Sequence, residues 1–150
     1  MTNPYTHVKR GTRSDLGVYV RSKVEANYIR FLNFVKVKWI YEPRIFYFDK
    51  IRRGTRSYTP DLLLPDEDSW VEIKIWFRQR DMTALKRFKY YYPEEFKKLR
   101  FVIHDPFSEA KKNVEAMKFL VDVLGIDADK IESYKEIKRY LAPLIPNWEV

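Results

Sequence analysis

The sequence contains no cysteine and only two histidines in 150 residues. Without thiols the chain can build neither a disulfide framework nor a thiolate metal site, and two isolated histidines argue against a histidine-rich zinc site. Any metal ion bound by this chain is therefore expected to have oxygen ligands.

Long apolar runs are also missing. No stretch approaches the roughly 18 consecutive apolar residues of a membrane-spanning helix, and the opening residues, MTNPYTHVKRGTRSD, lack the apolar segment of a secretion signal. We therefore expect no membrane partner and an intracellular, cytoplasmic location. Internal repeats and low-complexity tracts are absent too, which favours a single domain.

What the chain does have is a large apolar fraction and an excess of basic residues. Hydrophobic residues make up 45% and aromatic residues 17% of the chain, which suits a packed core at this length. The 29 basic and 21 acidic residues leave a formal charge of +8, which favours a polyanionic partner such as nucleic acid. Charge alone does not decide this, because many basic proteins bind no polyanion.

Patterns of apolar residues predict an α/β fold with the core order helix, three strands, helix, strand. Helical spacing predicts a helix over 22–36. β-branched and aromatic residues predict a strand over Trp39–Phe48, in which Pro43 indicates an edge position or a bulge. After a hairpin come a helix with Asp81 as N-cap that ends near Tyr92, and a buried strand over Leu99–His104.

The two ends of the chain carry other patterns. Residues Met1–Gly17 are polar and basic and read as a flexible arm, attached to a core that ends at residue 106. Residues 107–150 are predicted to form a helical extension packed on the same domain, with Ser108 and Ser133 as helix caps and Gly125 as a helix end.

The stretch Ser57–Trp76, SYTPDLLLPDEDSWVEIKIW, carries the chemistry. With a turn centred on Asp66 and Glu67, Asp61 lies opposite Glu72 across a β-hairpin. Directly opposed like charges are destabilising, so this pair requires a cation. Mg²⁺ fits, because it is commonly held by one or two carboxylates with waters and substrate phosphate completing its shell.

Lys74 follows Glu72 by two residues, so both side chains project from the same face of the strand. There the ammonium group would lie beside any metal-bound water, while the intervening apolar residues Val71, Ile73 and Ile75 point to the opposite, core side. The alternative is a half-exposed hairpin on which Lys74 and Glu72 form a surface ion pair. The Pro-Asp pair upstream, with an apolar strand and a turn before Glu72, favours the functional interpretation.

Glu25 has two compatible interpretations. Ser22 and Glu25 form the capping-box pattern, in which the Glu25 carboxylate bonds back to the Ser22 amide at the start of the helix. Glu25 also stands at the edge of the buried stripe, from where its carboxylate could lean over the sheet toward Asp61.

Basic residues flank the acidic hairpin. Arg52, Arg53 and Arg56 lie in the connector Asp49–Arg56, and two more basic side chains lie on the following helix. All are candidates for contacts with the DNA backbone, which carry no sequence information. Simple solvation of exposed positions is the alternative. The two basic residues on the helix that follows the hairpin are Lys86 and Arg87.

This constellation resembles the PD-(D/E)xK nuclease superfamily and, within it, the phage endonuclease I-type Holliday-junction resolvases. These carry a Tyr-Thr-Pro-Asp-hydrophobic-Leu-Leu-Pro stretch followed by Val-Glu-x-Lys, which Tyr58–Pro65 and Val71–Lys74 match. The family's Arg-Ser-x-x-Glu appears as Arg21, Ser22 and Glu25. The likeness covers Arg21–His104 and is specific in the hairpin.

The resemblance implies a restriction-endonuclease-like αβββαβ core, with a mixed central sheet flanked by helices, and metal-dependent hydrolysis of DNA phosphodiester bonds. The implied cofactor is Mg²⁺, with Mn²⁺ able to substitute. Its implied ligands are Asp61, Glu72 and the Ile73 carbonyl, with Glu25 as an additional acidic ligand, and Lys74 would serve the attacking water. The implied substrates are branched DNA and Holliday junctions.

Three departures from the family pattern keep other functions open. Ile75 stands where the family often has glycine, and a helical extension replaces a basic tail. The bridge across which family members exchange strands corresponds to Asp49–Arg56, which here is basic and contains glycine. The resemblance therefore implies a homodimer without fixing whether strands are exchanged, and the oligomeric state stays open. The alternatives are a sequence-directed or transposon-type endonuclease acting with a partner protein, and a non-catalytic nucleic-acid-binding module.

Overall fold

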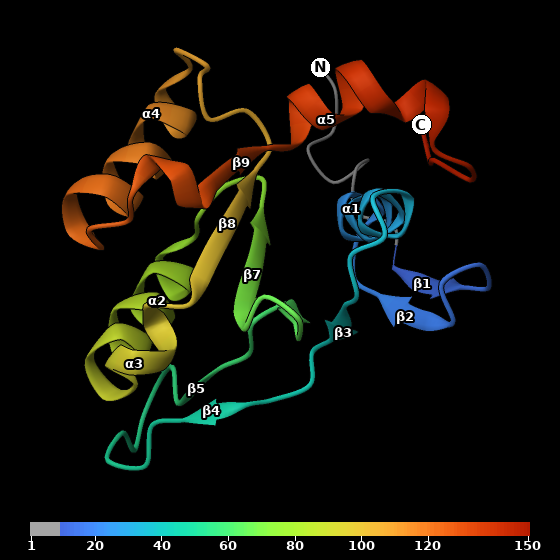
Figure 1. Cartoon of the computed structure of the whole chain (residues 1–150). Helices are drawn as coiled ribbons and strands as arrows, with labels where there is room; N and C mark the ends of the chain where they lie inside the picture. Colours follow the sequence, from blue (N-terminus) through green and yellow to red (C-terminus); the bar gives the residue numbers. More distant parts are fainter. Residues whose placement is uncertain (1–9) are drawn as a thin grey trace.

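The computed structural model describes residues 10–150 as an α/β protein built on a five-stranded mixed sheet (Figure 1). The pairings on the β3 side are antiparallel, and β7, β8 and β9 run parallel to one another. This confirms the predicted α/β class and mixed sheet. In spatial order the strands are β3 (Ile40–Tyr41), β6 (Leu62–Leu64), β7 (Ser69–Lys74), β8 (Leu99–Ile103) and β9 (Ile131–Ser133).

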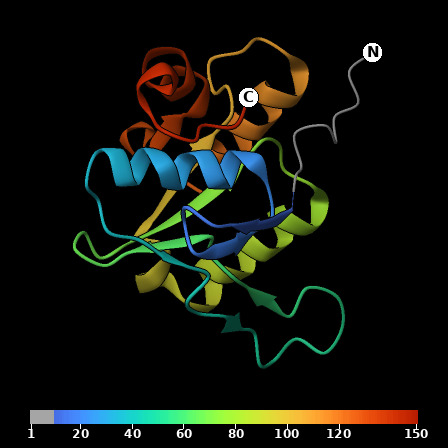
Figure 2. The same cartoon turned by 90° about the vertical axis from the view of Figure 1, so that its right-hand side faces the viewer.

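Helices cover both faces of the sheet, so each face has its own hydrophobic core. Along β7, Trp70 packs in the core on the α2 side, and Val71 and Ile73 pack in the core under α1, which lies across the sheet in Figure 2. The expected single core behind the hairpin is therefore incomplete, because the Glu72 side is buried too. One face carries α2 (Gln79–Tyr91), α3 (Pro93–Phe96) and α4 (Lys111–Lys118), and the other carries α1 (Lys23–Phe34) and α5 (Tyr134–Leu141).

The hairpin has the predicted register. Leu62 pairs with Val71 and Leu64 with Ser69, which places Asp61, one residue before β6, across from Glu72. Apolar alternation fixes such a register strongly, since a slip by one residue would exchange the two faces of the strand.

The strand expected over Trp39–Phe48 is broken into two short strands in different sheets. Its first part is β3, and its second part, β4 (Phe46–Tyr47), pairs with β5 (Ser57–Tyr58) in a separate two-stranded ribbon. The chain turns between them at Glu42, whose φ is +43°, directly before Pro43. We call residues 46–58 the β4–β5 arm, which projects from the body of the protein in Figures 1 and 2.

The prediction of a flexible N-terminal arm is wrong for residues 10–17. β1 (Gly11–Arg13) and β2 (Val18–Val20) form an antiparallel hairpin. The rest of the predicted arm, residues 1–9, lies outside the described residues.

The C-terminal third is less purely helical than expected, because β9 adds a parallel strand to the edge of the sheet beside β8. Ser133 caps α5 as predicted and accepts from the Glu136 amide at 3.3 Å. Ser108 does not cap a helix, since α4 begins only after Ala110. Gly125 has a φ of +71°, as a helix end requires. None of the helices within residues 10–150 combines the length and apolarity needed to cross a membrane.

Candidate functional site

The hairpin brings Asp61, Glu72 and Lys74 together. Asp61 and Glu72 are buried, with 8% and 4% of their surfaces exposed. Asp61 Oδ2 accepts a hydrogen bond from the Ile73 amide at 2.7 Å, and Lys74 Nζ lies 3.5 Å from Glu72 Oε1. Ile73, whose carbonyl is a candidate metal ligand, thus orients Asp61 through its N–H. The surface ion pair offered as an alternative is excluded, because the Glu72 carboxylate is inside the protein.

Two further residues hold this group, and sequence analysis assigned neither of them a role in the site. The buried Tyr58 donates its hydroxyl to Glu72 Oε2 at 2.6 Å. Asp81 Oδ1 lies 3.2 Å from Lys74 Nζ. Asp81 was predicted as an N-cap, but α2 begins at Gln79, so Asp81 stands in its first turn and accepts from the Arg78 amide at 2.9 Å.

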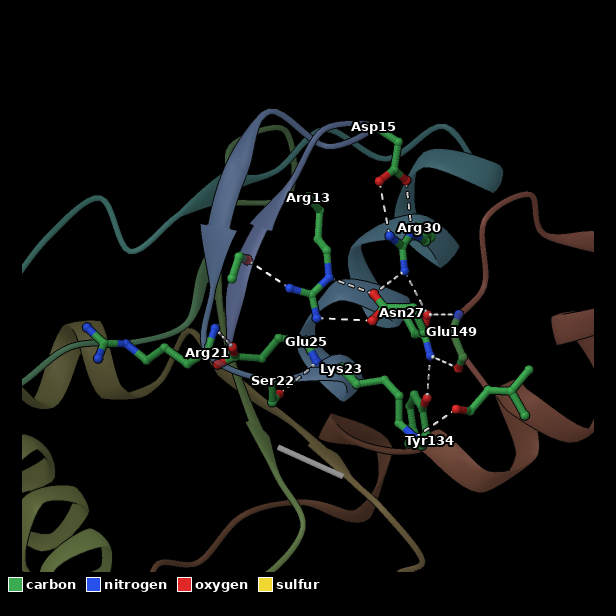
Figure 3. A network of polar contacts seen from close by, with 12 residues as sticks. Arg13, Asp15, Arg21, Ser22, Lys23, Glu25, Asn27, Arg30, Tyr134 and Glu149 are labelled. Carbon is green, nitrogen blue, oxygen red and sulfur yellow. Dashed lines mark hydrogen bonds and ion pairs between the residues drawn. The ribbon is translucent and has the colours of Figure 1, made fainter. Parts of the chain in front are cut away.

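Glu25 serves both as a helix-terminal acid and as a neighbour of the site. Its amide donates to Ser22 Oγ at 3.1 Å, as predicted, but its carboxylate accepts from the Arg21 amide at 2.8 Å rather than from Ser22 (Figure 3). The same carboxylate oxygen accepts from the Tyr41 hydroxyl at 3.2 Å. Since Tyr41 pairs with Leu62 in the sheet, this contact brings Glu25 to the strand that follows Asp61.

Burial and repulsion shift the pKa values of the carboxyl groups upward. Burial, followed by the charges of Glu72 and Glu25, raises the pKa of Asp61 well above its ordinary value. Burial raises the pKa of Glu72 to about 7, although Lys74 and the Tyr58 hydroxyl favour its ionised form. Burial alone would lower the pKa of Lys74, but the nearby carboxylates raise it above its ordinary value. Lys74 is therefore a charged ammonium group at neutral pH.

The donor set fits a hard divalent cation. Among residues 10–150, Lys74 is the only cation that forms an ion pair with Glu72, and Asp61 forms none, so the buried carboxylates outnumber the positive charges. Two carboxylates suffice for Mg²⁺. Within the described part of the chain no three acidic or histidine side chains form a ready metal cluster. Glu25 as an additional acidic ligand stays a prediction.

The predicted DNA-contact residues lie on two elements, the β4–β5 arm and α2, which contact each other. Arg52, Arg53 and Arg56 are exposed on the β4–β5 arm, and Lys86 is exposed on α2. Arg87 has a structural role as well, because its guanidinium group donates to the Thr55 carbonyl and ties the arm to α2. The segment equated with the family's exchange bridge joins two paired strands of one chain.

Comparison of the chain with models of protein families, with curated proteins and with solved structures finds no match in any of the three. Interpretation of the site therefore depends on its own geometry. The features that carry it are the register of the hairpin, the burial of two neighbouring carboxylates and the ammonium group held between Glu72 and Asp81.

Proposed function

We propose that the protein is a metal-dependent endodeoxyribonuclease with a PD-(D/E)xK-type active site on a restriction-endonuclease-like core. One observation carries the proposal: two buried carboxylates, Asp61 and Glu72, face each other across a hairpin beside a single lysine. A protein that only binds nucleic acid has no use for two acidic groups facing a phosphate. A cation-dependent hydrolase does, because the metal both offsets their repulsion and draws the phosphate to them.

Asp61, Glu72 and the carbonyl of Ile73 would hold one or two Mg²⁺ ions. Bound there, the metal supplies Lewis acidity toward the scissile phosphate and lowers the pKa of bound water. The residues of the chain do the positioning: the Ile73 amide orients Asp61, and the Tyr58 hydroxyl orients Glu72. Lys74, being charged, would orient the attacking water and stabilise negative charge that develops on the phosphate. Asp81 holds the ammonium group of Lys74 in place.

Selectivity for branched DNA, including Holliday junctions, is the finer part of this proposal. It is supported by the match of Tyr58–Pro65 to the resolvase pattern and by a basic arm that projects beyond the site. Such an arm can contact a second DNA segment while the hairpin contacts the first.

The test is a cleavage panel of four-way junction, nicked, flapped and plain duplex DNA, each with Mg²⁺ and with EDTA. We expect Mg²⁺-dependent cleavage that is faster on the branched substrates. Cleavage of plain duplex at a fixed sequence, or only with a partner protein, would favour the sequence-directed endonuclease. DNA binding without cleavage of any substrate would favour the non-catalytic module.

The role of Glu25 is decided by Glu25→Gln. Glutamine still accepts from the Arg21 amide and so preserves the helix start, but it removes the charge beside Asp61. If Glu25 is an additional acidic ligand, cleavage falls at least about tenfold while the melting temperature is unchanged. Unchanged cleavage would leave Glu25 with the capping role alone.

A further inference from the structure

The β4–β5 arm and the C-terminal end of α2 share a surface rich in tyrosine. Tyr47 and Tyr90 are 57% and 79% exposed. With Tyr91, Tyr92, Asp49 and Lys50 they line an open hollow of about 450 Å³. Large exposed aromatic rings gathered at one place are typical of binding surfaces rather than of ordinary solvated surface.

The rings on this surface are held by the core beneath them. The Tyr91 ring stacks on Phe48 with 5.6 Å between ring centroids, and Tyr90 meets Tyr91 edge-on at 5.0 Å. The Tyr92 hydroxyl donates to the Tyr47 carbonyl at 2.6 Å, which fixes the arm to the end of α2. The Tyr90 ring is therefore supported by Tyr91 and the core, and Tyr47 is anchored through its backbone, which reduces the conformational entropy lost on binding.

The β4–β5 arm also carries exposed positive charge that forms no ion pair within residues 10–150. Lys50, Arg52, Arg53 and Arg56 form no ion pair with any residue in 10–150, whereas elsewhere Arg21, Arg30 and Arg100 are all paired with carboxylates. An arm that carries both unpaired cations and an exposed aromatic ring is complementary to a nucleic acid strand whose bases are not paired.

We propose that this surface binds unpaired nucleotides of branched DNA, with bases stacked on Tyr47 and Tyr90 and phosphates beside the arm's arginines. The inference rests on the proposed function and names its substrate class. Paired bases are stacked inside a duplex and cannot lie flat on a tyrosine ring, so the rings distinguish unpaired from paired DNA.

The surface lies at a suitable distance from the acidic group. Asp81, which pairs with Lys74, stands in the first turn of α2, and Tyr90 stands in its last turn. With a rise of 1.5 Å per residue the two are separated by about 14 Å along the helix, which is about four base-pair steps of duplex. Tyr58 connects the two regions more directly, since it lies in β5 of the arm and donates to Glu72. The cleaved bond would thus lie a few nucleotides from the unpaired segment.

The test measures binding in EDTA, so that cleavage plays no part. The probes are a forked DNA with two single-stranded arms, the same fork with abasic arms, and a blunt duplex of equal length. We expect the wild-type protein to bind the intact fork about tenfold more tightly than the abasic fork. Tyr90→Ala and Tyr47→Ala should remove this difference, whereas Tyr90→Phe should keep it.

Salt dependence separates stacking from charge. The tyrosine variants should leave the slope of log affinity against log salt unchanged, whereas Arg53→Gln should reduce the slope by about 0.7. Tyr140→Ala is the matched control, since Tyr140 is 65% exposed beside Arg139 on α5, away from the arm. It should behave as wild type with every probe.

The inference is overturned if the intact and abasic forks bind equally, or if the Tyr47 and Tyr90 variants weaken fork and duplex to the same extent. The first result would leave a surface that contacts phosphates alone, and the second a surface for another class of partner. Failure of the proposed function looks different: the protein would cleave nothing in Mg²⁺, while the fork preference and its loss in Tyr90→Ala would persist in EDTA.

Discussion

Two polar networks within residues 10–150, one partly buried and one buried, use the same types of charged residue with opposite results. One is a clasp formed by Arg13, Asp15, Asn27, Arg30 and Glu149, which joins the β1–β2 hairpin and α1 to the C-terminal residues (Figure 3). Its charges balance, with two guanidinium groups facing two carboxylates at 2.7–2.9 Å. The other is the acidic group around Asp61 and Glu72, whose charges do not balance.

The pKa values of the carboxyl groups shift in opposite directions in the two networks. The hydrogen bond from Arg30 lowers the pKa of Asp15. Burial alone would raise the pKa of Glu149, but hydrogen bonds from Arg13 and Arg30 lower it overall. Asp61 and Glu72 shift the other way. A balanced network stabilises the fold by itself, whereas an unbalanced one keeps negative charge that the fold does not use, which is characteristic of a functional site.

The largest expected effect comes from removing the single lysine of the acidic group. Lys74→Ala should reduce cleavage at least about a hundredfold, because within residues 10–150 no other basic side chain pairs with Glu72 and could take over the positioning of the water and the stabilisation of charge on the phosphate. Salt-sensitive binding to DNA should stay nearly unchanged, since the proposed backbone contacts are made by the arm and not by Lys74. Parallel circular dichroism checks the fold, and an unfolded variant would mean that Lys74 is structural.

The pH dependence of stability should show the two networks acting in opposite directions. The folded protein keeps a proton on Glu72 up to about pH 7, whereas the unfolded chain loses it near the ordinary value of 4.5. Between these values the folded state binds more protons, so the free energy of unfolding falls as pH rises, by on the order of 3 kcal/mol in total.

The clasp changes the free energy of unfolding at lower pH. Its carboxyl pKa values are lowered on folding, so its contribution is present above their ordinary values and is lost as pH falls through the folded ones. The measurement is the free energy of unfolding in urea from pH 3 to 9, for the wild type and for Glu72→Gln. The difference between the two curves isolates the contribution of Glu72 between pH 4.5 and 7. A wild-type curve parallel to that of Glu72→Gln between pH 4.5 and 7 would contradict the assignment.

Breaking the clasp should weaken the fold without affecting the chemistry. Glu149→Gln removes the charge shared by Arg13 and Arg30, and the Arg30 guanidinium group is buried. Since Glu149 itself is partly exposed, we expect a loss of about 2 kcal/mol. Glu109→Gln, at an exposed position that forms no ion pair with the described residues, should cost almost nothing. Cleavage per folded molecule should be unchanged, and a specific loss of cleavage would connect the clasp to the site.

Removing one carboxylate of the acidic group should stabilise the fold and abolish cleavage. Asp61→Asn can still accept from the Ile73 amide but no longer repels Glu72. In EDTA at pH 8 we expect a gain of about 1 kcal/mol in the free energy of unfolding, together with loss of cleavage. Mg²⁺ should raise the melting temperature of the wild type by mass action and leave Asp61→Asn unchanged. Destabilisation by this change in EDTA would show that the carboxylate is a structural partner.

Elements specified by neighbouring residues could be predicted. The hairpin register followed from a turn between two alternating apolar segments, and Ser22 and Ser133 cap helices as their local patterns indicate. The prediction of one strand over Trp39–Phe48 was wrong. Strand propensity does not reveal that the chain turns at Glu42, so that the second half of this segment pairs in another sheet.

Contacts between distant segments could not be predicted. Arg30 meets Glu149 across 119 positions and Asp15 across 15, and none of the three belongs to a motif. The role of Asp81 was missed for a similar reason: a first-turn acid suggests a helix cap, and only the approach of α2 to β7 brings it to Lys74.

By itself, the sequence determined which residues could share one face of a hairpin: Asp61, Glu72 and Lys74 are placed by alternation and a turn, which are local properties of the backbone. Only the tertiary structure decided that this face is buried under α2, that Tyr58 and Asp81 hold it, and that within residues 10–150 no second cation pairs with Glu72. Burial and charge balance depend on every element packed around a group, and pairing within one hairpin does not specify them.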